Sequence, residues 1–226
     1  MNHFAIAIDG PSGAGKSTLA KALAAELGFL YVDTGAIYRT VGVYVYRKGV
    51  DPQDEAAVSA LFDEIEVDMA YGDDGLQHML LNGEDVTKAI REHAISDYAS
   101  IVSAHPSVRA FLLEKQRGFA RKYNVIMDGR DIGTVVLPDA TFKVFLTASV
   151  EVRAQRRYLE LQQRGEQVDY DTVLNDMRQR DERDTNRPTA PLRQAEDALL
   201  VDTTELSLEE SLSKLTALTK EKLFHE

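Results

Sequence analysis

Short apolar runs alternate along this chain with longer segments in which apolar residues recur every three or four positions. The short runs have the length of buried strands and span residues 4–8, 29–32, 125–127, 142–146 and 198–201. The longer segments predict helices at residues 18–27, 35–48, 107–122, 150–163, 170–186 and 207–223. Strands that alternate with helices predict an α/β fold with a parallel sheet flanked by helices. Ligands of such sheets bind beyond the carboxyl ends of the strands.

Residues 63–86 depart from this pattern. Apolar and polar residues alternate with a period of two between 65 and 71, Gly-Asp-Asp-Gly at 72–75 predicts a turn, and a second strand runs to Leu81. Asn82-Gly83 then gives a strong hairpin signal. We expect a small antiparallel insertion here, a solvated and acidic accessory element outside the core.

Residues 10–17 match the phosphate-binding template G-x-x-x-x-G-K-[ST] at every defined position, between an expected strand and an expected helix. Glycines at 10, 13 and 15 can adopt positive φ, so that successive N–H groups form a concave anion site. Lys16 is expected to reach the terminal phosphates of ATP, and the Ser17 hydroxyl to bind Mg²⁺. A Gly-Ser turn with a chance lysine is the alternative, but the flanking strand and helix favour a phosphate loop. The residues expected to bind ATP are Gly10, Pro11, Ser12, Gly13, Ala14, Gly15, Lys16, Ser17 and Thr18.

Composition narrows the function classes. The chain has 226 residues, which suits one domain with an insertion or two small domains. Its formal net charge of −11 argues against a general nucleic-acid or acidic-membrane surface. It contains no cysteine, which excludes disulfides and thiol chemistry. No signal-peptide pattern and no apolar run of ~20 residues is visible. We therefore expect a cytoplasmic monomer that binds neither membranes nor nucleic acid.

A polar cluster follows the second expected strand. Thr34 can cap the next helix, beside Gly35. Arg39 then lies one turn into that helix, near its positive end, which is unfavourable unless the guanidinium faces an anion. A solvated arginine on an ordinary helix is an equally good interpretation.

The segment Asp128-Gly129-Arg130-Asp131 follows the third apolar run. An acidic residue that ends a buried strand is the usual partner of Mg²⁺ in ATP sites of this kind, either directly or through water. Asp128 as a helix cap is the alternative. Opposite charges beside a glycine at the carboxyl end of a strand favour a binding site.

Residues 151–193 contain nine arginines and no lysine. The planar guanidinium binds phosphate oxygens in a bidentate manner, whereas lysine acts as a point charge. Arg180, Asp184 and Arg187 share one helical face, because they are spaced by four and three residues. A salt-bridged, solvated helix accounts for about half of these arginines. The remainder suit a mobile lid that closes on a triphosphate.

Together these motifs resemble bacterial cytidylate kinases, which belong to the nucleoside monophosphate kinases. The matching stretches are residues 8–17, 33–39, 128–136 and 180–187, and their order and lengths fit nearly the whole chain. The resemblance implies a P-loop NTPase fold and transfer of the γ-phosphoryl group of ATP to CMP or dCMP, with Mg²⁺ as cofactor. It implies a core at 1–34, 98–150 and 190–226, a monophosphate-binding region at 35–97 and an arginine-rich helical lid at 151–189.

The resemblance also implies roles for individual residues. Ser100, Arg109 and Asp131 would recognise cytosine, and Tyr38, Arg180 and Asp184 the sugar. Arg39, Arg130 and Arg187 would hold the acceptor phosphate or the transferring group and, with Lys16, form the catalytic set. Thr34 would contact CMP, although some family members have Ser there, and Arg157 would contact ATP.

Two other functions stay open. Another small P-loop kinase would act on UMP, AMP or a nucleoside. A nucleotide-dependent switch would bind nucleotide without transfer, but it has little use for an arginine-rich lid, and the chain has no Asn-Lys-x-Asp box.

Overall fold

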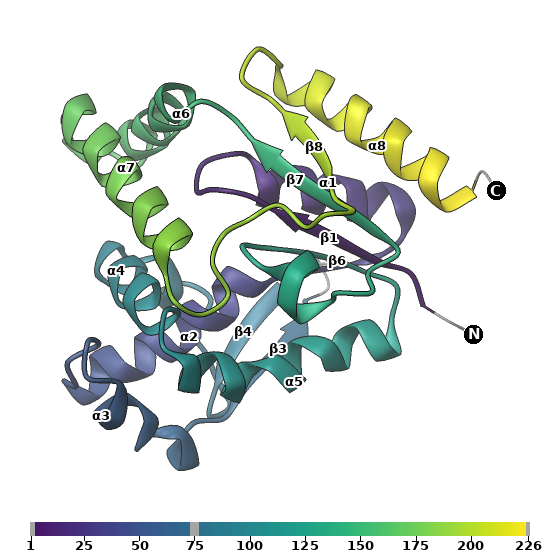
Figure 1. Ribbon diagram of the computed structural model, residues 1–226. Helices are drawn as coiled ribbons and strands as arrows, with labels where there is room; N and C mark the ends of the chain where they lie inside the picture. Colours follow the sequence, from purple (N-terminus) through teal and green to yellow (C-terminus); the bar gives the residue numbers. More distant parts are fainter. Residues whose placement is uncertain (1–2, 73–76, 225–226) are drawn as a thin grey trace. The chain divides into compact units, whose positions relative to one another are not determined.

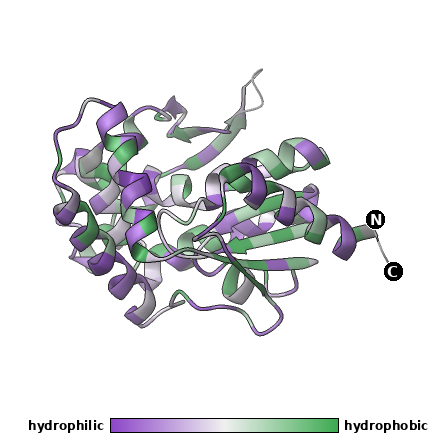
Figure 2. Cartoon of the chain, turned by 90° about the horizontal axis from the view of Figure 1, so that it is seen from above, coloured by the Kyte–Doolittle hydropathy of each residue, from purple (hydrophilic) through white to green (hydrophobic). Residues whose placement is uncertain are grey.

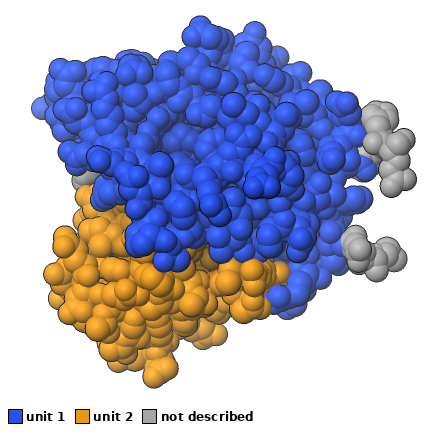
Figure 3. Space-filling view, in the orientation of Figure 1, with its two compact units in different colours: residues 1–31, 120–226 blue, residues 32–119 orange. Residues whose placement is uncertain are grey.

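The computed structural model describes residues 3–72 and 77–224. The chain forms two compact units, residues 1–31 with 120–226 (unit 1) and residues 32–119 (unit 2), which are coloured separately in Figure 3. No helix in the described ranges is both long and apolar enough to cross a membrane.

The expected five-stranded parallel sheet is confirmed. Its strands are β1 (Ala5–Asp9), β2 (Leu30–Asp33), β6 (Val125–Gly129), β7 (Phe142–Thr147) and β8 (Leu199–Asp202). Their spatial order is β2-β6-β1-β7-β8. β1 lies between β6 and β7, with Ile6 opposite Ile126 and Phe142. The phosphate loop therefore leaves a central strand, at the edge where the carboxyl ends of the strands meet.

The core of unit 1 lies between this sheet and two helices, α1 (Lys16–Leu27) and α8 (Leu208–Phe224). Leu19 and Leu23 of α1 and Leu215 of α8 pack in one buried cluster with Ile6 and Ile8 of β1. Each such side chain contributes about 1.5–3 kcal/mol when fully buried. Figure 2 shows hydrophobic residues along the strands, whereas the helices carry both hydrophobic and hydrophilic residues.

Helices α6 (Val150–Gln163) and α7 (Tyr170–Asn186) form the arginine-rich segment and pack against each other (Figure 1). A small core of Ala154, Leu161, Val173 and Met177 joins them. The Ser149 hydroxyl caps α6 and the Asp169 carboxylate caps α7, by accepting from Val152 N and Thr172 N. The predicted helices therefore form where the sequence places them. Between β6 and β7 lies a single π-helical turn, η3 (Ile132–Val136).

Unit 2 is built on α2 (Thr34–Lys48) and α4 (His93–Val102), which pack closely. A Cβ on Gly42 of α2 would lie 3.1 Å from the backbone nitrogen of Ala99 in α4, so the close approach requires glycine. The unit also contains α3 (Glu55–Ser59), the short 3-10 turns η1 (Phe62–Glu64) and η2 (Ala89–Arg91), and α5 (Pro106–Lys122) as far as Phe119. The sequence pattern did not predict α3 or α4.

The antiparallel insertion forms a three-stranded sheet of β3 (Val67–Tyr71), β4 (Gln77–Leu81) and β5 (Glu84–Asp85). Its hairpin is confirmed, because Asn82 and Gly83 have φ of 51° and 81°. Three residues of the expected turn at 72–75 lie outside the described residues. The expectation that the insertion stands outside the core is wrong: Val67, Met79 and Leu81 are buried. Alternation with a period of two places these side chains on one face, and β3 and β4 pack against α2.

Candidate active site

The phosphate loop has the backbone conformation that its glycines predict. Gly10, Gly13 and Gly15 have φ of 149°, 74° and 88°. A Cβ on Gly10 would lie 1.9 Å from the Leu146 carbonyl oxygen, so no other residue fits there. Gly15 is the N-cap of α1 and has no side chain, so the first N–H groups of the helix stay available for an anion.

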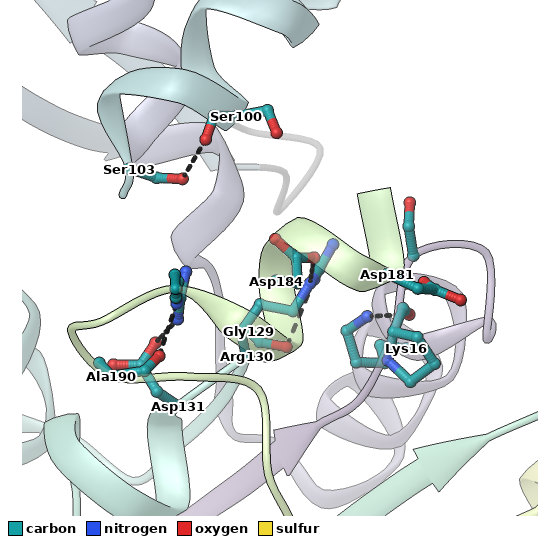
Figure 4. Close-up of polar contacts among 12 residues, drawn as sticks. Lys16, Ser100, Ser103, Gly129, Arg130, Asp131, Asp181, Asp184 and Ala190 are labelled. Carbon is teal, nitrogen blue, oxygen red and sulfur yellow. Dashed lines mark hydrogen bonds and ion pairs between the residues drawn. The ribbon is translucent and has the colours of Figure 1, made fainter. Parts of the chain in front are cut away.

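Lys16 begins α1 and is buried, with 5% of its surface exposed. Its ammonium donates to the Pro11 carbonyl within the same loop at 2.7 Å (Figure 4). Burial, followed by the positive charge of Arg130, lowers the pKa of Lys16 to about 7, although Asp128 and Asp184 act in the opposite direction. The protonated form of Lys16 is therefore disfavoured in this loop unless an anion binds next to it.

Asp128 ends β6 beside the phosphate loop. Its carboxylate accepts from the Ser17 hydroxyl at 2.7 Å and from the Tyr31 hydroxyl at 2.9 Å. A loop serine next to a strand-end aspartate is the donor set that holds Mg²⁺ in P-loop NTPases. Within residues 3–72 and 77–224 no three His, Asp or Glu side chains form a metal cage.

Arg130 and Asp184 form a buried ion pair, with Nε 2.8 Å from Oδ2 (Figure 4). Burial alone would lower the pKa of Arg130, but Asp184 raises it. Burial would likewise raise the pKa of Asp184, yet Arg130, with Arg180 and Arg187, holds it below its usual value. The fold thus brings the Asp-Gly-Arg-Asp segment and α7 together, as the sequence suggested.

Arg187 is the C-cap of α7, and Pro188 follows it. Its Nη2 donates to Asp131 at 3.2 Å and its Nε to the Ala190 carbonyl at 2.6 Å. Both side chains of the pair are almost fully buried, at 6% and 5% exposure. Arg187 at the end of α7 therefore pairs with Asp131, and Arg130 after β6 pairs with Asp184 of α7.

Arg157 lies elsewhere on the arginine-rich segment. It donates to Glu160 on its own helix at 2.9 Å, a partly exposed pair with i,i+3 spacing. Surface pairs of this kind are worth at most about 1 kcal/mol.

In unit 2, the predicted site residues Tyr38, Ser100 and Arg109 form a second group together with Ser103. The Arg109 guanidinium lies 5.4 Å from the centre of the Tyr38 ring. Its Nη1 donates to the Ser103 carbonyl, while the Ser103 hydroxyl donates to the Ser100 carbonyl at 3.1 Å (Figure 4). Arg109 is buried although it is cationic.

At the start of α2 the structure corrects one expectation. Asp33, not Thr34, is the N-cap, and its carboxylate accepts from Ala36 N at 2.8 Å. Thr34 begins the helix and is buried. The other oxygen of Asp33 pairs with Arg39 Nη2 at 2.8 Å. Arg39 does face an anion, which here is this carboxylate.

Three residues of this region, Asp9, Arg153 and Asp181, were not among the site residues predicted from the sequence. Asp9 is buried at the end of β1 and accepts two backbone hydrogen bonds. Arg153 donates to the Ser12 carbonyl of the phosphate loop at 3.1 Å and pairs with Asp181 of α7. A strand-end aspartate next to the loop was visible in the sequence, but nothing there separates Arg153 from the other arginines.

A parallel sheet with a phosphate loop, a buried loop lysine, and a serine bonded to a strand-end aspartate defines a P-loop NTPase, and the arginines beside the lysine indicate a kinase. The cytidylate kinase family model matches residues 6–221. The chain belongs to the cytidylate kinase family, and it is therefore a transferase.

Individual relatives agree with the family model. A cytidylate kinase of Caldicellulosiruptor bescii is 48% identical over 96% of this chain and 96% of its own length. One from Carboxydothermus hydrogenoformans is 50% identical over 93% and 94%. A third, from Geobacter sulfurreducens, is 48% identical over 96% and 93%.

Proposed function

We propose that this protein transfers the γ-phosphoryl group of ATP to CMP or dCMP and releases ADP and CDP or dCDP. The observation that carries the proposal is the grouping in unit 1 of the Lys16 loop, Asp128 and the Arg130–Asp184 pair. Family membership over residues 6–221 supports cytidine nucleotides as acceptors.

ATP is proposed to bind with its phosphates in the loop at residues 10–18, where N–H groups and Lys16 supply positive charge. Arg157 would contact ATP after leaving Glu160. Mg²⁺ would be held by Ser17 and Asp128, the latter directly or through water, and would neutralise charge on the phosphate oxygens. The negative charge of the bound phosphates would favour the protonated form of Lys16, whose pKa is low in the protein alone.

Individual residues are proposed to contact the parts of CMP as follows. Asp131 would accept from the cytosine amino group, and Arg109 would donate to its ring nitrogen or carbonyl, with Ser100 nearby in the chain. Tyr38, Arg180 and Asp184 would bind the sugar. The phosphate would replace carboxylates as partner of Arg39, Arg130 and Arg187, and Thr34 would contact the nucleotide.

The chemistry needs no general base. An oxygen of the CMP phosphate, already anionic, forms the new bond to the γ-phosphorus, and the bond from that phosphorus to the bridging oxygen of ADP breaks. Lys16, Arg130, Arg187 and Arg39 would stabilise the charge that moves onto the leaving oxygen and the transferred group. Closure of α6 and α7 over the reactants would exclude water and suppress ATP hydrolysis.

The proposed roles of Asp131 as acceptor and Arg109 as donor would favour CMP over UMP. Uracil presents a carbonyl where cytosine has its amino group, and a ring N–H where cytosine has an acceptor. Each mismatch would leave a buried group unpaired, at a cost of about 1–3 kcal/mol. An AMP or UMP kinase, or a switch that binds nucleotide without transfer, is less well supported.

The experiment is a panel of nucleoside monophosphates with ATP and Mg²⁺. We expect diphosphate formation with CMP and dCMP to exceed that with UMP, AMP and GMP by at least an order of magnitude. Faster turnover of another acceptor would replace the proposed substrate, and nucleotide binding without any transfer would support the switch.

A further inference from the structure

The carboxylate of Asp9 holds two consecutive backbone amides. Asp9 ends β1, immediately before the phosphate loop, and only 4% of its surface is exposed. One of its oxygens accepts from Ile132 N at 2.8 Å and the other from Gly133 N at 2.7 Å. These amides open the turn η3, where a carboxylate stabilises the free N–H groups.

Asp9 also holds the chain on the other side of Asp131. In the ladder between β1 and β6, Asp9 is the register partner of Gly129. Residues 129–133 therefore form a short arch whose two ends are both fixed on Asp9, one by strand pairing and one by its side chain. Asp131 lies within this arch, with φ −145° and ψ 27°. This backbone conformation belongs to neither a regular strand nor a helix, so the neighbouring contacts must maintain it.

Gly133 allows the close approach. A Cβ at this position would lie 3.4 Å from the Asp9 carboxylate and 3.1 Å from the Lys143 side chain. The distance to Asp9 is an ordinary contact, whereas the distance to Lys143 is tight, so an added side chain would displace either Lys143 or the Gly133 backbone.

The arch carries one half of the buried pair between Asp131 and Arg187. Arg187 is also held at its Nε by the Ala190 carbonyl, so it cannot follow a displaced Asp131 without losing that bond. A small movement of the arch would therefore change both the direction of the Asp131 carboxylate and its distance from Arg187.

We propose that Asp9 is a positioning residue for recognition of the acceptor base, because it fixes Asp131 through the amides of Ile132 and Gly133. The inference rests on the assignment of Asp131 to cytosine recognition. This role of Asp9 requires no contact with substrate. Burial raises the pKa of Asp9 to about 6, while the two amides act against this rise. The carboxylate is therefore ionised at neutral pH and can accept both bonds.

The test is the variant Asp9→Asn, assayed by ADP release with CMP and with UMP. The amide keeps one acceptor but directs an NH₂ group at the second N–H. We expect the ratio of kcat/KM for CMP to kcat/KM for UMP to fall about tenfold, since one buried hydrogen bond is lost. The KM for ATP should stay within about twofold of its original value.

A second variant approaches the same contact from its other partner. Gly133→Ala adds a methyl group 3.1 Å from the Lys143 side chain and 3.4 Å from the Asp9 carboxylate, so the Gly133 amide should shift and the CMP-to-UMP ratio should again fall. Asp54→Asn is the matched control: Asp54 accepts from Ala57 N at the start of α3, and asparagine caps helices equally well. This control should leave all kinetic constants unchanged.

The variant Asp131→Asn distinguishes a failure of the proposed base recognition by Asp131 from a failure of the positioning role of Asp9. An unchanged CMP-to-UMP ratio in Asp131→Asn would overturn the assignment of Asp131 to the base. A lowered ratio there, with an unchanged ratio in both Asp9→Asn and Gly133→Ala, would overturn only the role of Asp9. Equal rises in the KM for ATP and for CMP in Asp9→Asn would show a general structural role and would also overturn it.

Discussion

Arg153 and Asp181 form a bidentate ion pair between α6 and α7, with N–O distances of 3.0 and 2.6 Å. The same guanidinium donates to the Ser12 carbonyl in the phosphate loop and to the Ala148 carbonyl at the end of the β7 region. Arg153 is buried, with 5% of its surface exposed. One side chain therefore connects the phosphate loop to both helices of the arginine-rich segment.

Asp181→Asn should weaken this connection. We expect the free energy of unfolding to fall by about 1–3 kcal/mol, because a buried guanidinium loses its counter-charge, and the KM for ATP to rise several-fold. Urea denaturation and steady-state kinetics measure the two effects. The matched control is Glu151→Gln, which breaks the Arg178–Glu151 pair, also between α6 and α7 but more than half exposed on both sides. That change should cost less than about 0.5 kcal/mol; an equal loss in both variants would contradict a special role for Arg153.

Lys16→Ala should lower kcat by about a hundredfold or more, because it removes a buried cation aimed at developing charge. The folded state should lose little stability, since burial already disfavours the charged ammonium. Lys21→Ala, an exposed lysine on the same helix, serves as control and should keep normal turnover. Near-normal ADP release by Lys16→Ala would remove the lysine from the catalytic set.

Asp128→Asn should increase the Mg²⁺ concentration needed for half-maximal activity by about tenfold or more, because a neutral amide binds Mg²⁺ less well than a carboxylate. Ser17 and Tyr31 donate to different oxygens of Asp128, so one hydroxyl can keep donating to the amide oxygen while the other can accept from the amide NH₂, and folding should persist. A Mg²⁺ titration of activity measures the shift, and the exposed Asp139→Asn provides the comparison. An unchanged Mg²⁺ requirement would argue against the proposed metal site.

Stability should depend on pH through Asp9. Burial, with a smaller contribution from Asp131, raises its pKa from 3.8 to about 6, although the amides of Gly133 and Ile132 and the charge of Lys16 oppose this rise. The unfolded chain releases this proton near pH 3.8 and the folded chain near pH 6, so the folded state binds more protons in this window. Stability relative to Asp9→Asn should therefore fall by about 3 kcal/mol as the pH rises from below 4 to above 6, and stay level beyond pH 7. Urea denaturation across this range checks the sign, and a difference that grows with pH would contradict it.

Much of the fold could be predicted from local pattern. The five apolar runs and the spacing of leucines in α1 place the strands and several helices within a few residues, because burial imposes a period on each element. The insertion shows the limit of such reasoning. Its alternation predicted strands, but only packing against α2 shows that Val67, Met79 and Leu81 belong to a core. α4 was missed, and its burial against α2 depends on the close approach at Gly42.

The candidate site likewise contains residues that could be predicted from the sequence and residues that could not. The phosphate loop is contiguous, so its glycines, Lys16 and Ser17 could be identified from spacing alone. The cap at Asp33 was missed, because Asp33 and the adjacent Thr34 are both good capping residues and only the backbone decides between them. Arg153 could not be distinguished from other arginines, since its partners Ser12 and Asp181 lie 141 and 28 residues away.

The sequence by itself determined the α/β alternation, the phosphate loop and the chemical types available to the site, because these depend on neighbours along the chain. Only the tertiary structure decided which charges meet: Ser17 with Asp128, Arg130 with Asp184, and Arg187 with Asp131. The physical reason is burial. A charged group removed from water must find a partner, and which partner lies within about 3 Å depends on how the strands and helices pack.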